Sequence, residues 1–107
     1  MVDFEQLQGT HRWTFTYDVE RGAFLQCWDP SFICITPDSI HFTYGVDAID
    51  ANCQPLGIQY LSLGDYPILF TAPNTLSIDG VPYLVSITAD RGYVLWNEEK
   101  GGYKLEK

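Results

Sequence analysis

Basic residues are scarce in this chain. Six Lys and Arg stand against fourteen Asp and Glu among 107 residues, so the formal net charge is −8. Nucleic acids and anionic lipid surfaces are bound by clustered Lys and Arg, and here the six are scattered from Arg12 to Lys107. We therefore expect neither a nucleic acid nor a membrane as a partner.

Long apolar runs are also missing. The run from Tyr66 to Phe70 has few residues, whereas a helix that spans a bilayer needs about 20. The start, Met1 to Gln6, is acidic, while a secretory signal opens with basic residues and an apolar stretch. These absences favour a cytoplasmic protein.

Cysteine is rare and its count is odd. Cys27, Cys34 and Cys53 form no Cys-x-x-Cys pair and no zinc-type pattern with histidine. An odd count without a leader favours reduced thiols that pack as small apolar side chains. The acidic stretch from Asp47 to Asn52 lacks the order of a calcium loop. We expect no metal and no cofactor.

Helix signals are confined to the first residues. Phe4 to Gln8 can form one helical turn, which Gly9 would end. The rest of the chain alternates apolar and polar residues with a period of two, as in Thr10 to Asp18. Asp79-Gly80 is the strongest hairpin signal, because both turn positions favour a positive φ. Gly64-Asp65 is expected to be another turn.

The pattern predicts about eight to ten short strands. Short connections impose antiparallel neighbours, and a long up-and-down sheet must curl or split. We predict an all-β fold, a small antiparallel up-and-down β-barrel over residues 1–107 as a single domain, with a β-sandwich as the alternative. The stretch from Gly45 to Pro55 is the longest irregular segment and is typical of a functional or mobile loop.

Sixteen aromatic residues supply the large side chains of the expected interior. Alternation places His11, Trp13, Phe15 and Tyr17 on one face of the first strand, which we expect to face inward. The interior of an eight-stranded barrel is either filled by its own side chains or holds one small ligand, and the sequence leaves both open. The predicted ligand-binding residues are Trp13, Tyr17, Tyr44 and Tyr83 on the interior walls and Trp28 and Trp96 at a mouth.

The opening of the chain resembles that of the calycins, the superfamily of lipocalins and fatty-acid-binding proteins. Phe4 and Leu7 on a helical turn, then Gly9-Thr10 and Trp13, are similar to their short helix, glycine and first-strand tryptophan. Lipocalins have Gly-x-Trp, whereas Trp13 here follows Gly9 by four positions. The resemblance covers about fifteen residues and implies a barrel that holds an apolar ligand.

A second resemblance is to the phenolic acid decarboxylases and the related MoaF-like barrels. Gly9-Thr10-His11 and Thr16-Tyr17-Asp18 are similar to the first strand of these proteins. The family holds a substrate carboxylate with two tyrosines of that strand. Alignment on Thr-Tyr puts Phe15 at one of the two positions, so only the hydroxyl of Tyr17 is retained.

Three hypotheses for function follow. The first is a small-molecule binding module that holds an apolar or aromatic ligand inside the barrel. The second is an acidic interaction protein of the inhibitor or immunity type, which covers a basic protein partner with the Gly45–Pro55 loop and the Glu98-Glu99 turn. The third is a barrel enzyme on a phenolic or carboxylated small molecule, in which Tyr17 is essential. No catalytic motif is present, so we favour binding over catalysis. A homodimer is compatible with each.

Overall fold

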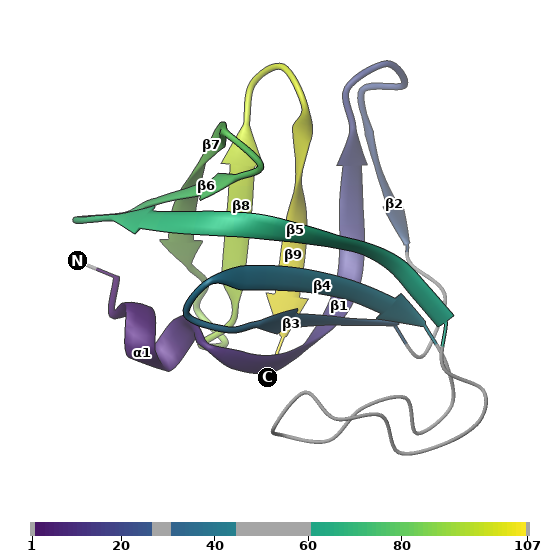
Figure 1. Cartoon of the computed structure of the whole chain (residues 1–107). Coiled ribbons are helices and arrows are strands. Elements are labelled where there is room, and N and C mark those ends of the chain that lie inside the picture. Colours follow the sequence, from purple (N-terminus) through teal and green to yellow (C-terminus); the bar gives the residue numbers. More distant parts are fainter. Residues whose placement is uncertain (1, 27–30, 45–60, 107) are drawn as a thin grey trace.

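The computed structural model describes residues 2–26, 31–44 and 61–106, and these residues form nine strands and one helical turn (Figure 1). The Gly45–Pro55 loop, Trp28, Cys27 and Cys53 lie outside the described residues. The elements are α1 (Phe4–Leu7), β1 (Gly9–Asp18), β2 (Ala23–Gln26), β3 (Ser31–Ile35), β4 (Ser39–Tyr44), β5 (Leu61–Thr71), β6 (Thr75–Ile78), β7 (Val81–Ile87), β8 (Tyr93–Asn97) and β9 (Gly101–Glu106).

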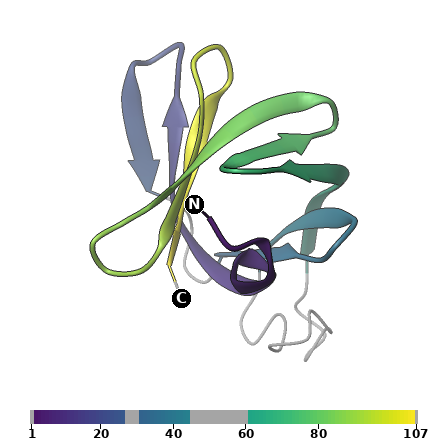
Figure 2. The same ribbon diagram turned by 90° about the vertical axis from the view of Figure 1, so that its left-hand side faces the viewer.

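Eight of these strands close a barrel. Neighbours pair antiparallel in the order β1-β3-β4-β5-β6-β7-β8-β9, and β9 returns to pair with β1 from Arg12 to Tyr17. β2 pairs with the last residues of β1 as an additional strand. Figure 2 shows the sheet curling round until β9 lies beside β1. The predicted antiparallel barrel is confirmed, and closure removes the sheet edges that an open meander would leave exposed.

The helical turn lies at one end of the barrel (Figure 2). Asp3 caps it, because the Asp3 side chain accepts a hydrogen bond from the backbone N–H of Glu5 at 3.0 Å. Leu7 is 0% exposed and packs in the core. Nε2 of His11 donates to the carbonyl oxygen of Leu7 at 2.6 Å, so His11 ties α1 to β1. Its structural role accounts for the burial of this histidine.

The β6–β7 hairpin turns where the sequence predicts it. Asp79 and Gly80 have φ angles of 51° and 82°, and Ile78 pairs with Val81 on either side of them. These are the positive angles that a two-residue hairpin loop needs. In contrast, the expected turn at Gly64-Asp65 does not form, and β5 continues through it. Here β5 pairs with β4, and the register shifts next to Gly64.

A β-bulge in β1 changes which side chains face the interior. The register between β1 and β9 shifts between Trp13 and Phe15. Trp13 lies opposite buried Leu105, and after the shift Thr16 lies opposite Tyr103. Nε1 of Trp13 donates to Oγ1 of Thr16 at 2.9 Å, so both side chains are on the inner face.

Phe15 and Tyr17 therefore lie on the outer face of the barrel. The prediction that Trp13, Phe15 and Tyr17 share the inner face is wrong for the latter two. The physical reason is that a bulge places one extra residue in the strand and reverses the alternation beyond it. Oγ1 of Thr14, the residue at the bulge, is buried without a hydrogen-bond partner.

Cys34 corrects another expectation. It is 1% exposed and disulfide-bonded rather than a reduced thiol, and its partner lies outside the described residues. Disulfides persist mainly in oxidising compartments. The prediction of a cytoplasmic location loses the support that it drew from reduced thiols.

In the part of the chain that the structure describes, no helix has the length and apolar character to cross a membrane.

Candidate functional site

Aromatic rings from four strands meet inside the barrel. The ring of Phe42 on β4 lies 5.2 Å from Trp13 on β1, 5.9 Å from Tyr66 on β5 and 5.1 Å from Tyr103 on β9, between ring centroids. Tyr83 on β7 extends the group, with its ring 5.9 Å from that of Tyr103. Rings at these separations are in contact, so in this region the interior is filled by its own side chains.

Three of these rings, those of Tyr66, Tyr83 and Tyr103, carry hydroxyl groups. Burial raises the pKa of the Tyr103 phenol well above its ordinary value of 10.0, and the neighbouring phenols of Tyr83 and Tyr66 raise it further. A buried phenolate would lose its hydration and would lie close to other electron-rich oxygens. Tyr103 therefore stays neutral inside the barrel and can act as a hydrogen-bond donor at ordinary pH.

Tyr103→Phe is expected to make the protein less sensitive to alkali. The pKa of Tyr103 is raised in the folded state. Below about pH 10 the phenol is protonated in both the folded and the unfolded chain, so Tyr103 contributes fully to the free energy of unfolding there. Above that pH the unfolded chain loses the proton first, so the folded state loses stability. Urea unfolding between about pH 9 and about pH 11 should show a steeper loss in the natural protein than in the variant. Identical slopes would show that Tyr103 is not responsible.

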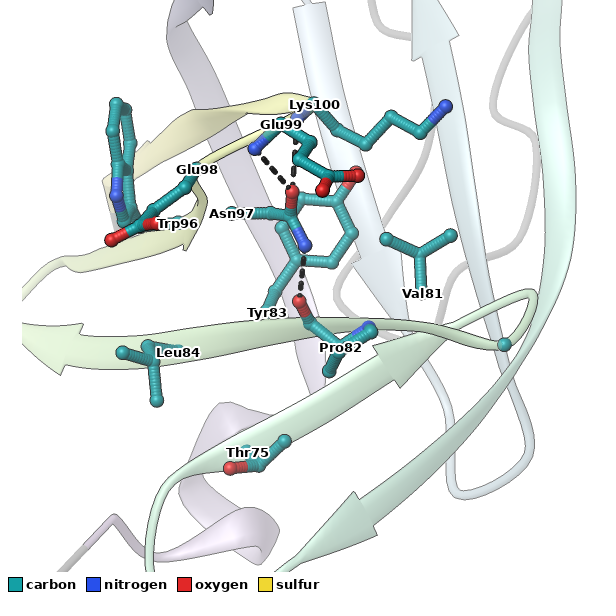
Figure 3. A pocket seen from close by; sticks show the side chains of 11 residues that line it. Thr75, Val81, Pro82, Tyr83, Leu84, Trp96, Asn97, Glu98, Glu99 and Lys100 are labelled. Atoms are coloured by element: carbon teal, nitrogen blue, oxygen red, sulfur yellow. Dashed lines mark hydrogen bonds between the residues drawn. The ribbon is translucent and has the colours of Figure 1, made fainter.

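A groove of about 620 Å³ lies between the start of β7 and the β8–β9 turn (Figure 3). We call it the end groove. Its apolar walls are Val81, Pro82, Leu84 and Trp96. The remaining lining residues are Thr75, Gly80, Tyr83, Asn97, Glu98, Glu99 and Lys100. Two other hollows of the described surface, beside Pro73 and beside Leu69, are smaller, at about 350 and 320 Å³.

Asn97 fixes the shape of the end groove. Its Nδ2 donates to the carbonyl oxygen of Pro82 at 2.8 Å, across to β7. Its Oδ1 accepts from the backbone N–H groups of Glu99 and Lys100 at 2.8 and 2.9 Å (Figure 3). These three bonds tie the turn to the neighbouring hairpin, so the walls are held in place before any ligand arrives. The charged side chains of Glu98, Glu99 and Lys100 supply further polar groups of the groove lining.

Tyr83 joins the end groove to the interior cluster. It is 6% exposed, lines the groove and contacts Tyr103. Trp96 lies on the opposite, outer side of the sheet, because its neighbour Leu95 is buried in the core. The ring of Trp96 lies 4.9 Å from that of Tyr17. The groove therefore begins at the interior aromatic cluster and opens onto the outer face.

The predicted site residues are separated by the structure. Trp13 and Tyr83 belong to the interior cluster, and Tyr83 and Trp96 line the end groove. Tyr17, on which the enzyme hypothesis rests, is on the outer face. The side chain of Tyr44 and all of Trp28 lie outside the described residues.

Sequence reasoning missed the residues that complete the site. Tyr103 and Leu105 are two residues apart in the last strand and so lie on the same face of it. This period-two pattern could have placed Tyr103 inside the barrel. Leu84, Val81 and Asn97 had no comparable signal, because their roles depend on which hairpins become neighbours.

The remaining histidine lies in a hydrogen-bonded surface group. Nδ1 of His41 lies 3.3 Å from a carboxylate oxygen of Asp65, and Nε2 lies 3.3 Å from Oγ of Ser39. Asp65 is exposed, and the end groove does not include this group. Among the residues in the described ranges, no three His, Cys, Asp or Glu side chains are placed to hold a metal ion.

The end groove combines apolar walls, an aromatic ring on each side of the sheet and charged groups on one turn. Comparison of the chain with family models, with curated proteins and with solved structures found no match.

Proposed function

We propose that this protein is a binding module for a small ligand with an apolar or aromatic body, which lies in the end groove. The observation that carries the proposal is the groove itself. A volume of about 620 Å³ lies within the range of ligand pockets, and the lining combines apolar walls with a few polar groups. The ligand would lie against Trp96 and Leu84, with its polar part toward the Glu98–Lys100 turn.

The site differs from the one that the sequence suggested. A ligand in the interior would have to displace the contacts between Trp13, Phe42 and Tyr103. The end groove needs no such displacement, because its walls are already separated and its turn is held by Asn97. Binding there costs less reorganisation than opening a packed aromatic core.

We also propose a calycin-like ancestry for the barrel. The support is the closed eight-stranded barrel together with the capped turn α1 and Trp13 on the inner face of the first strand. The spacing between Gly9 and Trp13 still departs from that of the lipocalins. The proposal for the ligand does not depend on this ancestry, because it rests on the groove alone.

A neutral fluorescent probe tests the ligand site. N-phenyl-1-naphthylamine is expected to bind saturably with a Kd of about 10–100 μM, since it has two aromatic parts and few polar atoms. Leu84→Ser and Val81→Ser should each weaken binding by about fivefold or more, because each removes an apolar wall.

The matched control is Leu69→Ser. Leu69 is 68% exposed, lines the smaller hollow on β5 and does not line the end groove. Binding that survives Leu69→Ser and is lost in the groove variants would support the proposal. Absence of saturable binding in the natural protein, or a loss only in Leu69→Ser, would overturn it.

A further inference from the structure

A continuous apolar row crosses the outer face of the barrel. Tyr17 on β1 and Trp96 on β8 both lie directly opposite Gly102 on β9, and Leu84 on β7 lies opposite Trp96. We call Tyr17, Gly102, Trp96 and Leu84 the outer ladder. Cross-strand neighbours share one face of a sheet, so these side chains form a single surface.

This surface is unusual for the outside of a small barrel. The outer face of an antiparallel sheet that covers one core normally carries polar residues. Leu84 is 53% exposed, Tyr17 and Trp96 are partly exposed, and the bulge after Trp13 turns Tyr17 outward beside Trp96. Contiguous apolar side chains that solvent reaches on a sheet commonly mark a surface where another molecule binds.

Carboxylates stand at one end of the outer ladder. Asp18 ends β1 and Glu20 lies in the β1–β2 turn, and the β8–β9 turn carries Glu98 and Glu99. The two hairpins extend side by side (Figures 1 and 2), and the start of β9 packs against the end of β1. The adjoining end of the ladder therefore faces a cluster of negative charge.

The nearby cations offset only part of this charge. Nε of Arg21 lies 3.6 Å from a carboxylate oxygen of Asp18, and Lys100 is the other cation of the two turns. Four carboxylates thus stand against two cations at this end. The ion pairs of the described chain do not include Glu98 or Glu99. Both carboxylates are available to a partner.

We propose that the outer ladder docks a basic segment of a partner protein. Apolar side chains of the segment would pack on Leu84 and Tyr17, and an arginine would stack on Trp96 beside the carboxylates. The charge of −8 favours a basic occupant and opposes a second copy of this chain, which carries the same charge.

This inference goes beyond the small-ligand function, because it concerns a protein partner on the face beside the end groove. Trp96 and Leu84 belong to both surfaces. Val81 lines the groove, packs against the core and is not part of the ladder, whereas Tyr17 belongs to the ladder and not to the groove. Val81→Ser and Tyr17→Ser can therefore separate failure of one proposal from failure of the other.

A synthetic peptide tests the docking surface. A peptide of about ten residues that alternates arginine with leucine is titrated against the whole protein by calorimetry, with a glutamate–leucine peptide as its control. We expect the basic peptide to bind, to weaken about fivefold or more between about 50 and about 300 mM salt, and to outcompete the acidic peptide.

Three variants complete the experiment. Tyr17→Ser and the double variant Glu98→Gln, Glu99→Gln should each weaken peptide binding about fivefold or more, and Val81→Ser should leave it unchanged. The double variant changes only exposed turn residues, so it keeps the test decisive if Tyr17→Ser does not fold. Equal binding of both peptides, no effect of Tyr17→Ser or of the double variant, or a dimer in sedimentation that Tyr17→Ser dissociates would overturn the proposal.

Discussion

Gly101→Ala is expected to destabilise the protein by about 3–5 kcal/mol, among the largest effects of any single substitution in the chain. Two independent reasons combine at this glycine. Its φ angle is 87°, which strains any residue with a Cβ. A Cβ added there would also overlap the backbone carbonyl oxygen of Tyr17, in the strand to which β9 pairs to close the barrel. A backbone oxygen within a sheet ladder cannot move aside without breaking the pairing.

Gly80→Ala is the matched control. Gly80 has nearly the same φ angle, 82°, but an added Cβ there would have no atom within 4 Å. The control therefore carries only the conformational cost, about 1–2 kcal/mol. Urea unfolding of both variants measures the difference. Equal losses would show that the closure between β1 and β9 tolerates the extra atom and that the packing argument is wrong.

Phe42→Ala is expected to destabilise the protein by about 3–5 kcal/mol. The Phe42 ring is 5% exposed and contacts the rings of Trp13, Tyr66 and Tyr103. Its removal takes away the transfer free energy of the ring and leaves a cavity among side chains from three strands. Thermal unfolding with calorimetry measures the loss.

Benzene provides a second readout on the same variant. An apolar cavity left by an aromatic side chain stays dry and can accept a small aromatic molecule. Saturating benzene should therefore raise the Tm of Phe42→Ala by more than it raises that of the natural protein. Phe42→Leu, which keeps most of the volume, should lose only about 1–2 kcal/mol and gain little from benzene. A shift in Phe42→Ala no larger than that of the natural protein would mean that the substitution leaves no cavity that benzene can fill.

Local sequence patterns predict much of the fold. The Asp79-Gly80 turn, the single helical turn near Phe4 and the alternating strands were all readable, because each depends on neighbours in the sequence. Antiparallel closure followed from short connections between many strands. The turn expected at Gly64-Asp65 failed for the opposite reason. Pairing with β4 holds these residues in β5, and the local sequence does not show which strand will pair with them.

The candidate site was less predictable than the fold. Trp13, Tyr83 and Trp96 were identified as large rings, and they do lie in the interior cluster or the end groove. Tyr17 was assigned to the wrong face, because one extra residue in β1 reverses every side chain beyond it. A bulge forms when two strands adjust their register to each other, so the sequence of one strand alone does not predict it.

The amino-acid sequence by itself determined the all-β class, the acidity and the supply of aromatic side chains, and it favoured a barrel over a sandwich, since periodicity and composition are properties of the chain alone. Only the tertiary structure decided where those side chains act. The pairing of β7 with β8 and the hydrogen bond from Asn97 to Pro82 shaped the end groove. Closure between β1 and β9 brought the rings around Phe42 together and set Tyr17 beside Trp96 on the outside. The physical reason is that such contacts join strands far apart in sequence, and their register is fixed only when the barrel closes.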